Sequence, residues 1–138
     1  MATLKISDLS VGDWVRWVLY DKTFDICISQ IMDHHVRGVL DGVECGMRMP
    51  QLSPIPITAE ILERNGLFRH EFDADNPQEV VLSNYFMLVR TYTDVDWWRV
   101  LIYDEEMPSR ELFNGIVYYV HQLQHALRLA GVEKEINL

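Results

Sequence analysis

Apolar and polar residues alternate through the first part of the chain and predict short antiparallel strands. One strand runs from Trp14 to Tyr20, in which Val15, Trp17 and Leu19 share a face because successive strand side chains point to opposite sides. A second strand runs from Phe24 to about Met32. The pattern is typical of a sheet with one covered face.

An Asp-Gly dipeptide at positions 41–42 predicts a tight hairpin, since both central residues of a type I′ turn need positive φ. A two-residue loop there sets Val36 opposite Met47 on an apolar face and Arg37 opposite Gly46 on a mixed face. Register and burial pattern therefore agree. Asp33, His34 and His35 lie before this hairpin, and we interpret them as turn residues.

Residues 50–56 contain three prolines and are expected to form an extended connector rather than a central strand. After the connector, Thr58 is a suitable N-cap for a short helix and Gly66 a suitable end for it. We place the main boundary here. The sequence predicts a β-rich lobe at 1–53 and an α+β lobe at 54–138, although both could also belong to one continuous domain.

The second half of the chain predicts three more strands and a long helix. The strands are Leu67–Phe72, Val80–Thr91 and Trp97–Tyr103, and the helix runs from Ser109 to about Ala130. Strands followed by a short helix, more strands and a closing helix indicate an α+β fold, with the last helix packed on an antiparallel sheet.

Two histidines, His121 and His125, lie one turn apart on this expected helix. Counting 100° per residue from Leu112, they fall opposite the apolar stripe and are expected to face water. The spacing could also supply two ligands of a zinc site, but a third is not apparent, and Gln122 stands where the metalloprotease pattern needs Glu. A solvated helix face is the preferred interpretation, and a small metal-dependent hydrolase is the alternative. No cofactor is expected.

The strand from Trp97 to Tyr103 offers a candidate interaction surface. If Trp98 faces the core, Trp97, Arg99 and Tyr103 lie on the other side. Trp, Tyr and Arg dominate binding hot spots. The alternative is that a second layer, such as the final helix, covers this face as well.

Charge and composition narrow the classes of partner. Twelve basic against twenty-one acidic residues give a formal charge of -9, which disfavours direct binding to nucleic acid or anionic membranes. No apolar run approaches the roughly 20 residues of a membrane span, and the N-terminus lacks a secretory h-region. We therefore expect a cytoplasmic protein in which Cys27 and Cys45 are free thiols.

Three stretches of the chain are notable in combination: LSVGDWV (9–15), PIPITAEILERNGLF (54–68) and YVHQLQHALRLAGVE (119–133). Together they resemble a family of small uncharacterised proteins from prophages and mobile elements of gut Bacteroides-type bacteria. The resemblance implies a bacterial or phage cytoplasmic setting, and no functional residues carry over from it. Separately, GDWV followed by hairpins is similar to the start of SH3-like barrels, so the first lobe is expected to be SH3-like or a half-barrel.

Three functional hypotheses follow from the sequence. The first is a non-enzymatic protein-interaction or accessory module of a phage or mobile element, which binds another protein or a second copy of itself. The second is the small hydrolase that uses His121 and His125. The third is an acidic decoy that occupies the basic groove of a DNA-binding protein, and it rests on the charge of -9.

Overall fold

The computed structural model describes residues 4–67, 78–83, 85–90, 97–107 and 109–138. The chain divides into two compact units. The first comprises Met1–Ile55 together with Tyr119–His121 and Leu138, and the second comprises Pro56–Tyr118 and Gln122–Asn137. The sequence predicts a boundary between residues 53 and 54, and the first segment of this unit ends two residues later, at Ile55.

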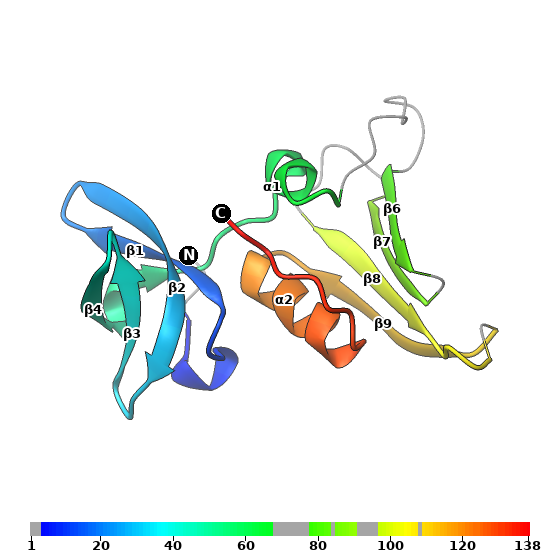
Figure 1. Cartoon of the computed structure of the whole chain (residues 1–138), viewed down its shortest axis with the longest axis horizontal. Helices are drawn as coiled ribbons and strands as arrows, with labels where there is room; N and C mark the ends of the chain where they lie inside the picture. The colour runs from blue at the N-terminus through cyan, green and yellow to red at the C-terminus, as the bar shows by residue number, and fades with distance from the viewer. Residues whose placement is uncertain (1–3, 68–77, 84, 91–96, 108) are drawn as a thin grey trace. The chain divides into compact units, whose positions relative to one another are not determined.

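The first unit is built on a five-stranded antiparallel sheet with the strand order β4-β3-β2-β1-β5 (Figure 1). A short 3-10 helix, η1, precedes the sheet, and another, η2, leads into β5. The elements are η1 (Ile6–Asp8), β1 (Trp14–Leu19), β2 (Lys22–Ile31), β3 (His35–Leu40), β4 (Val43–Arg48), η2 (Met49–Gln51) and β5 (Leu52–Ser53). Residues 52–53 lie inside the stretch predicted to be an extended connector, yet they form a short strand that pairs with β1. This strand, β5, is at the edge of the sheet, where nearby prolines are tolerated.

Strand β2 is shared between the two halves of this sheet. Its first part pairs with β1 from Lys22 to Cys27, and its last part pairs with β3 as far as Ile31. The register shifts between Ile28 and Gln30, and such a bulge bends a strand and increases its twist. One apolar core lies along the sheet, formed by Leu4, Leu9, Val15, Ile26, Ile28, Val36, Met47 and Leu52.

The hairpin predicted from the Asp-Gly dipeptide is confirmed. Asp41 and Gly42 have φ values of 52° and 80°, as a type I′ turn requires. Val36 lies opposite Met47, both fully buried, and Arg37 lies opposite Gly46 on the outer face. Local turn chemistry and the apolar pattern were sufficient to fix this register.

The second unit contains a four-stranded antiparallel sheet with the order β6-β7-β8-β9, and two helices. Its elements are α1 (Ala59–Arg64), β6 (Gln78–Ser83), β7 (Phe86–Arg90), β8 (Trp98–Tyr103), β9 (Glu111–Val117) and α2 (Val120–Leu129). Figure 1 shows α2 lying along one face of this sheet. Antiparallel strands with two helices make the chain an α+β protein, as the sequence predicted.

One face of this sheet is apolar and buried. The alternation in β8 is confirmed, because Trp98, Val100 and Ile102 are buried while the residues between them are half-buried. Cross-strand partners continue this inner face with Phe86, Leu88 and Val117. The guanidinium carbon of Arg90 lies 4.5 Å from the centre of the Trp98 ring, a cation–π contact that caps the indole.

The prediction of one helix from Ser109 to Ala130 is wrong. Glu111–Val117 forms strand β9, and the helix α2 begins only at Val120 and spans 10 residues. Residues 112–117 include Phe113, Ile116 and Val117, which favour a strand when a neighbouring strand is available to pair, and Gly115, which disfavours a helix interior. Strand β8 provides that neighbour, as in the pairs of Trp98 with Val117 and Arg99 with Ile116.

The prediction of a single strand from Val80 to Thr91 is also wrong. This segment forms two antiparallel strands, β6 and β7, in which Ser83 pairs with Phe86. The chain reverses between them, so that β6 and β7 pair with each other in the same sheet. The predicted strand Leu67–Phe72 lies outside the described residues beyond Leu67.

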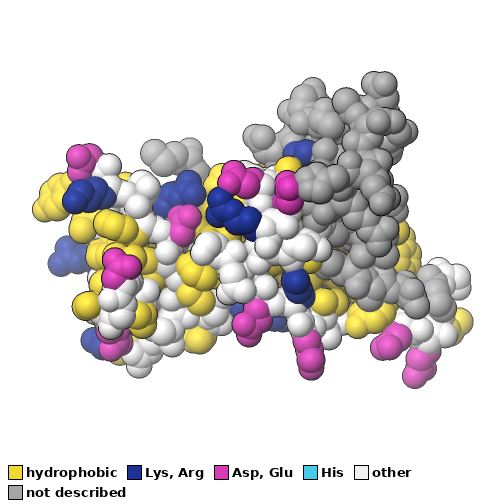
Figure 2. All heavy atoms as spheres, turned by 45° about the horizontal axis from the view of Figure 1, so that its top comes forward, with side chains coloured by type: hydrophobic (Ala, Val, Ile, Leu, Met, Phe, Trp, Pro, Cys, Tyr) yellow, Lys and Arg dark blue, Asp and Glu magenta, His cyan; other side chains and the backbone are white. Residues whose placement is uncertain are grey.

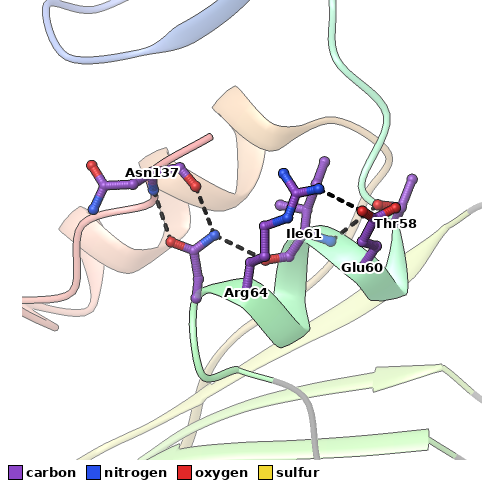
Figure 3. A network of polar contacts seen from close by, with 6 residues as sticks. Thr58, Glu60, Ile61, Arg64 and Asn137 are labelled. Atoms are coloured by element: carbon purple, nitrogen blue, oxygen red, sulfur yellow. Dashed lines mark hydrogen bonds and ion pairs between the residues drawn. The ribbon is translucent and has the colours of Figure 1, made fainter.

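Helix α1 begins and ends where the sequence predicted. The Thr58 hydroxyl accepts a hydrogen bond from the Ile61 amide at 3.1 Å, and Gly66, after the helix, has a φ of 70° (Figure 3). Arg64 also forms an ion pair with Glu60 one turn earlier. Capping residues and a left-handed glycine are local signals, so they act regardless of tertiary context.

Beyond α1, the side chain of Asn65 holds the last residues of the chain in an arrangement that we call the Asn65–Asn137 clasp (Figure 3). The amide nitrogen of Asn65 donates to the carbonyl oxygens of Ile61 at 2.8 Å and of Asn137 at 2.9 Å. The Asn137 amide donates to Oδ1 of Asn65 at 2.8 Å. Asn65 is buried, and beside the clasp Ile136 is buried as well.

Candidate functional site

The candidate interaction residues lie on the face of the second sheet opposite the buried one. Arg99, Leu101 and Tyr103 of β8 alternate with the buried residues and are half-buried. The strand registers extend this surface with Met87 and Val89 of β7 and with Asn114 and Ile116 of β9. We call these seven residues the outer sheet face. Trp97 directly precedes β8 and is also half-buried.

The outer sheet face combines apolar side chains with one ordered cation. Nη1 of Arg99 donates a hydrogen bond to Oδ1 of Asn114 at 2.6 Å, which holds the guanidinium along the sheet. Ile116, the cross-strand partner of Arg99, is 44% exposed. The exposed Ile116 thus lies beside an arginine held by Asn114, with the half-buried Leu101 and Tyr103 on the same face.

The two histidines of α2 do not share the same environment. His121 is only 4% exposed, whereas His125 is half-buried. The prediction that both face water is therefore wrong for His121. His121 and Gln124 are buried as well as Val120, Leu123 and Leu127, so the covered side of α2 is wider than the predicted apolar stripe. Two other residues of that stripe, Leu112 and Ile116, lie in β9 and are exposed, so their predicted burial is wrong.

His121 packs beside an aromatic neighbour rather than within a ligand set. Its ring lies parallel to that of Tyr119, with centres 6.0 Å apart and planes at 9°. Within the part of the chain that the structure describes, no three His, Cys, Asp or Glu side chains are grouped so that they could hold a metal ion. The hydrolase hypothesis thus gains no third ligand from these residues.

We expect His121→Ala to lower the free energy of unfolding by about 1–3 kcal/mol, because it removes a buried, packed ring. His125→Ala is the matched control and is expected to cost less, since His125 retains more contact with solvent. Thermal unfolding with and without added zinc provides the measurement. A wild-type midpoint that rises with zinc, and a loss of that rise in either variant, would contradict the structural role.

Charged side chains of both signs are mixed over the surface. Figure 2 shows Lys and Arg interspersed with Asp and Glu over the described part of the visible face. Three ion pairs contribute to this arrangement: Arg16 with Asp25, Arg37 with Glu44, and Arg64 with Glu60. Exposed pairs of this kind add little stability and provide no extended basic surface for phosphates.

Two further predictions concern the thiols and the membrane. Cys27 and Cys45 are free and half-buried, and Sγ of Cys27 donates to the carbonyl oxygen of Gly12 at 3.4 Å. Among the described residues, no helix has both the length and the apolar composition needed to cross a bilayer.

Comparisons of the chain with protein-family models, with curated proteins and with solved structures found no match.

Proposed function

We propose that the chain is a non-enzymatic protein-interaction module whose partner binds the outer sheet face. The observation that carries the proposal is the composition of this face. Half-buried and exposed apolar side chains surround Arg99, which is held in place by Asn114. Aromatic residues and ordered arginines contribute most of the binding energy at protein interfaces, and Trp97 and Tyr103 lie in the same segment.

We further propose that the first unit is an SH3-like half-barrel that serves as a second scaffold in the same module. Its topology supports this proposal: four strands follow one another as a meander, and β5, which follows a 3-10 turn, pairs back onto β1. The bulged strand β2 supplies the bend that a half-barrel needs. A cytoplasmic setting in a phage or mobile element remains part of the proposal and rests on the sequence resemblance.

Replacement of Ile116 by Asp is expected to weaken partner binding by about tenfold or more, because it places a carboxylate among the apolar side chains of the outer sheet face. Trp97→Ala is expected to act in the same direction. Sedimentation velocity over a concentration series measures binding to a second copy, and affinity capture followed by titration of the captured protein measures binding to another chain.

Val39→Ser in the first unit is the matched control. Val39 is 54% exposed and lies on a strand, so its loss removes a similar exposed side chain away from the outer sheet face. A wild-type chain that stays monomeric and retains no specific protein would overturn the proposal. Equal weakening by Val39→Ser and Ile116→Asp would also overturn it.

The hydrolase and decoy hypotheses rest on the sequence alone, and no arrangement within the described residues adds to either.

A further inference from the structure

A recess of about 440 Å³ opens on the surface of the first unit, at the end of the β3–β4 hairpin that is opposite its Asp-Gly turn. It is lined by His34, His35, Gly46, Met47, Arg48 and Pro50. Three of these six residues have side chains that can donate hydrogen bonds to an anion, and none of the six is acidic. This is unusual in a chain with a formal charge of -9.

The hairpins of the first unit bring these residues together. The Met32 amide donates to the carbonyl oxygen of His35 at 2.9 Å, which closes the turn between β2 and β3 and places His34 in the bend directly before β3. His35 then lies directly opposite Arg48 at the open end of the β3–β4 hairpin. Cross-strand partners share a face, so an imidazole and a guanidinium extend from the same side of the sheet.

A glycine leaves the space between them open. Gly46 lies two residues before Arg48 on the same face, and it has no side chain to fill the gap. A Cβ atom added there would meet only Cδ2 of His35, at 3.9 Å. The floor is therefore backbone, which lets a small ligand approach both basic side chains closely.

The guanidinium of Arg48 forms no ion pair within the part of the chain that the structure describes. Arg16, Arg37 and Arg64 each form an ion pair with a carboxylate. By contrast, no ion pair among the described residues involves Arg48, His34 or His35. A guanidinium presents a planar fork of N–H groups that matches the geometry of a carboxylate or phosphate, and a histidine ring can donate an N–H to the same oxygen.

We propose that this recess is a binding site for an oxyanion group, a carboxylate or a phosphate, with Arg48 as its anchor and His34 and His35 as additional donors. The alternative ligand for paired histidines, a metal cation, is disfavoured because the guanidinium of Arg48 would repel it. Pro50 adds an apolar contact, so the favoured ligand carries its anionic group on a larger organic body, whereas the side chain of Met47 is fully buried in the core. The site lies in the first unit and does not depend on the outer sheet face.

The proposal is tested by NMR titration of the full chain at constant ionic strength. Inorganic phosphate and acetate are the probes, and sodium chloride is the ionic control. We expect saturable shifts of the backbone amides at 34–35 and 46–48, with weak affinity for these fragments. Shifts spread evenly over the surface, or equal to those caused by chloride, would overturn the proposal.

Two variants separate a built site from general attraction by charge. Arg48→Gln removes the anchor, and Gly46→Val fills the recess while it keeps all three basic residues. Each is expected to weaken phosphate binding about tenfold or more. Arg110→Gln removes an exposed arginine elsewhere and is expected to leave binding unchanged. If Gly46→Val, with its amide dispersion and thermal midpoint retained, bound phosphate as the wild type does, the recess would not be the site.

The source of the oxyanion is resolved by two peptides that differ only at the C-terminus, one with a free carboxylate and one amidated. Tighter binding of the free carboxylate than of acetate indicates recognition of a protein terminus, and tighter binding of phenyl phosphate than of inorganic phosphate indicates a small phosphate ester. Both results support the oxyanion site. A carboxylate peptide and its amide that bind equally well at 34–35 and 46–48, without competition from phosphate, would overturn it.

Discussion

Gly38→Ala is expected to lower the free energy of unfolding by about 3 kcal/mol, because the interior has no room for even one methyl group at this position. A Cβ on Gly38 would overlap Cγ2 of Ile26 and lie 2.8 Å from the carbonyl oxygen of Cys27. The Ile26 side chain could turn only within a packed core. The Cys27 carbonyl belongs to the backbone of β2, so it cannot move without disturbing the sheet.

Gly46→Ala is the matched control on the same hairpin. Gly46 lies on the opposite face, where its added methyl meets ordinary van der Waals contact, and its unfolding free energy is expected to change by less than about 0.5 kcal/mol. Urea unfolding of both variants gives the comparison. Equal losses would mean that the penalty arises from the loss of glycine itself and not from the close approach of β2.

Asn65→Ala is expected to cost about 2–4 kcal/mol, since it removes all three hydrogen bonds of the Asn65–Asn137 clasp at a buried position. It also leaves the amide and the carbonyl of Asn137 without the side chain that they face. The amide proton of Asn137 should then exchange with solvent much faster, and urea unfolding together with hydrogen exchange measures both effects.

Asn137→Ala is the control, because the clasp uses only the backbone of Asn137. Its side chain is exposed at this position, and its replacement is expected to change stability by less than about 0.5 kcal/mol. Slow exchange of the residue 137 amide in Asn65→Ala would show that the end of the chain is held by Ile136 packing rather than by the clasp.

Features that depend on neighbouring residues could be predicted from the sequence. The turn at Asp41 and Gly42 and the helix cap at Thr58 rest on backbone dihedrals and short hydrogen bonds that the local residues determine. The alternation of β8 was also predicted, with Trp98, Val100 and Ile102 on one face, although alternation alone does not tell which face is buried.

Features that depend on partners distant in the sequence could not be predicted from it. Residues 111–117 carry apolar spacing that suits a helix, and only pairing with β8 selects the strand. The same error displaced the start of α2, and the environment of His121 was wrong for a separate reason, because the covered side of α2 is wider than the predicted apolar stripe. Packing that is remote in sequence outweighs local propensity at both places.

The oxyanion recess was missed although its signal was present. The predicted register of the Asp-Gly hairpin, extended by one pair beyond Val36 and Met47, sets His35 against Arg48. The histidines were interpreted as turn residues on their own, without their cross-strand neighbours. The pairing of β3 with β4, and not the order of residues along the chain, brings the imidazole and the guanidinium together.

The first unit is discontinuous in sequence, and this affects the order in which it can be completed. Its long segment ends at Ile55, yet the carbonyl oxygen of that residue accepts its hydrogen bond from the amide of Val120, 2.8 Å away. During synthesis, the ribosome delivers residues 119–121 only after most of the second unit has emerged. A nascent chain therefore lacks the Val120 partner of Ile55 until then, although the strands and the apolar core of the first unit all lie within residues 4–53.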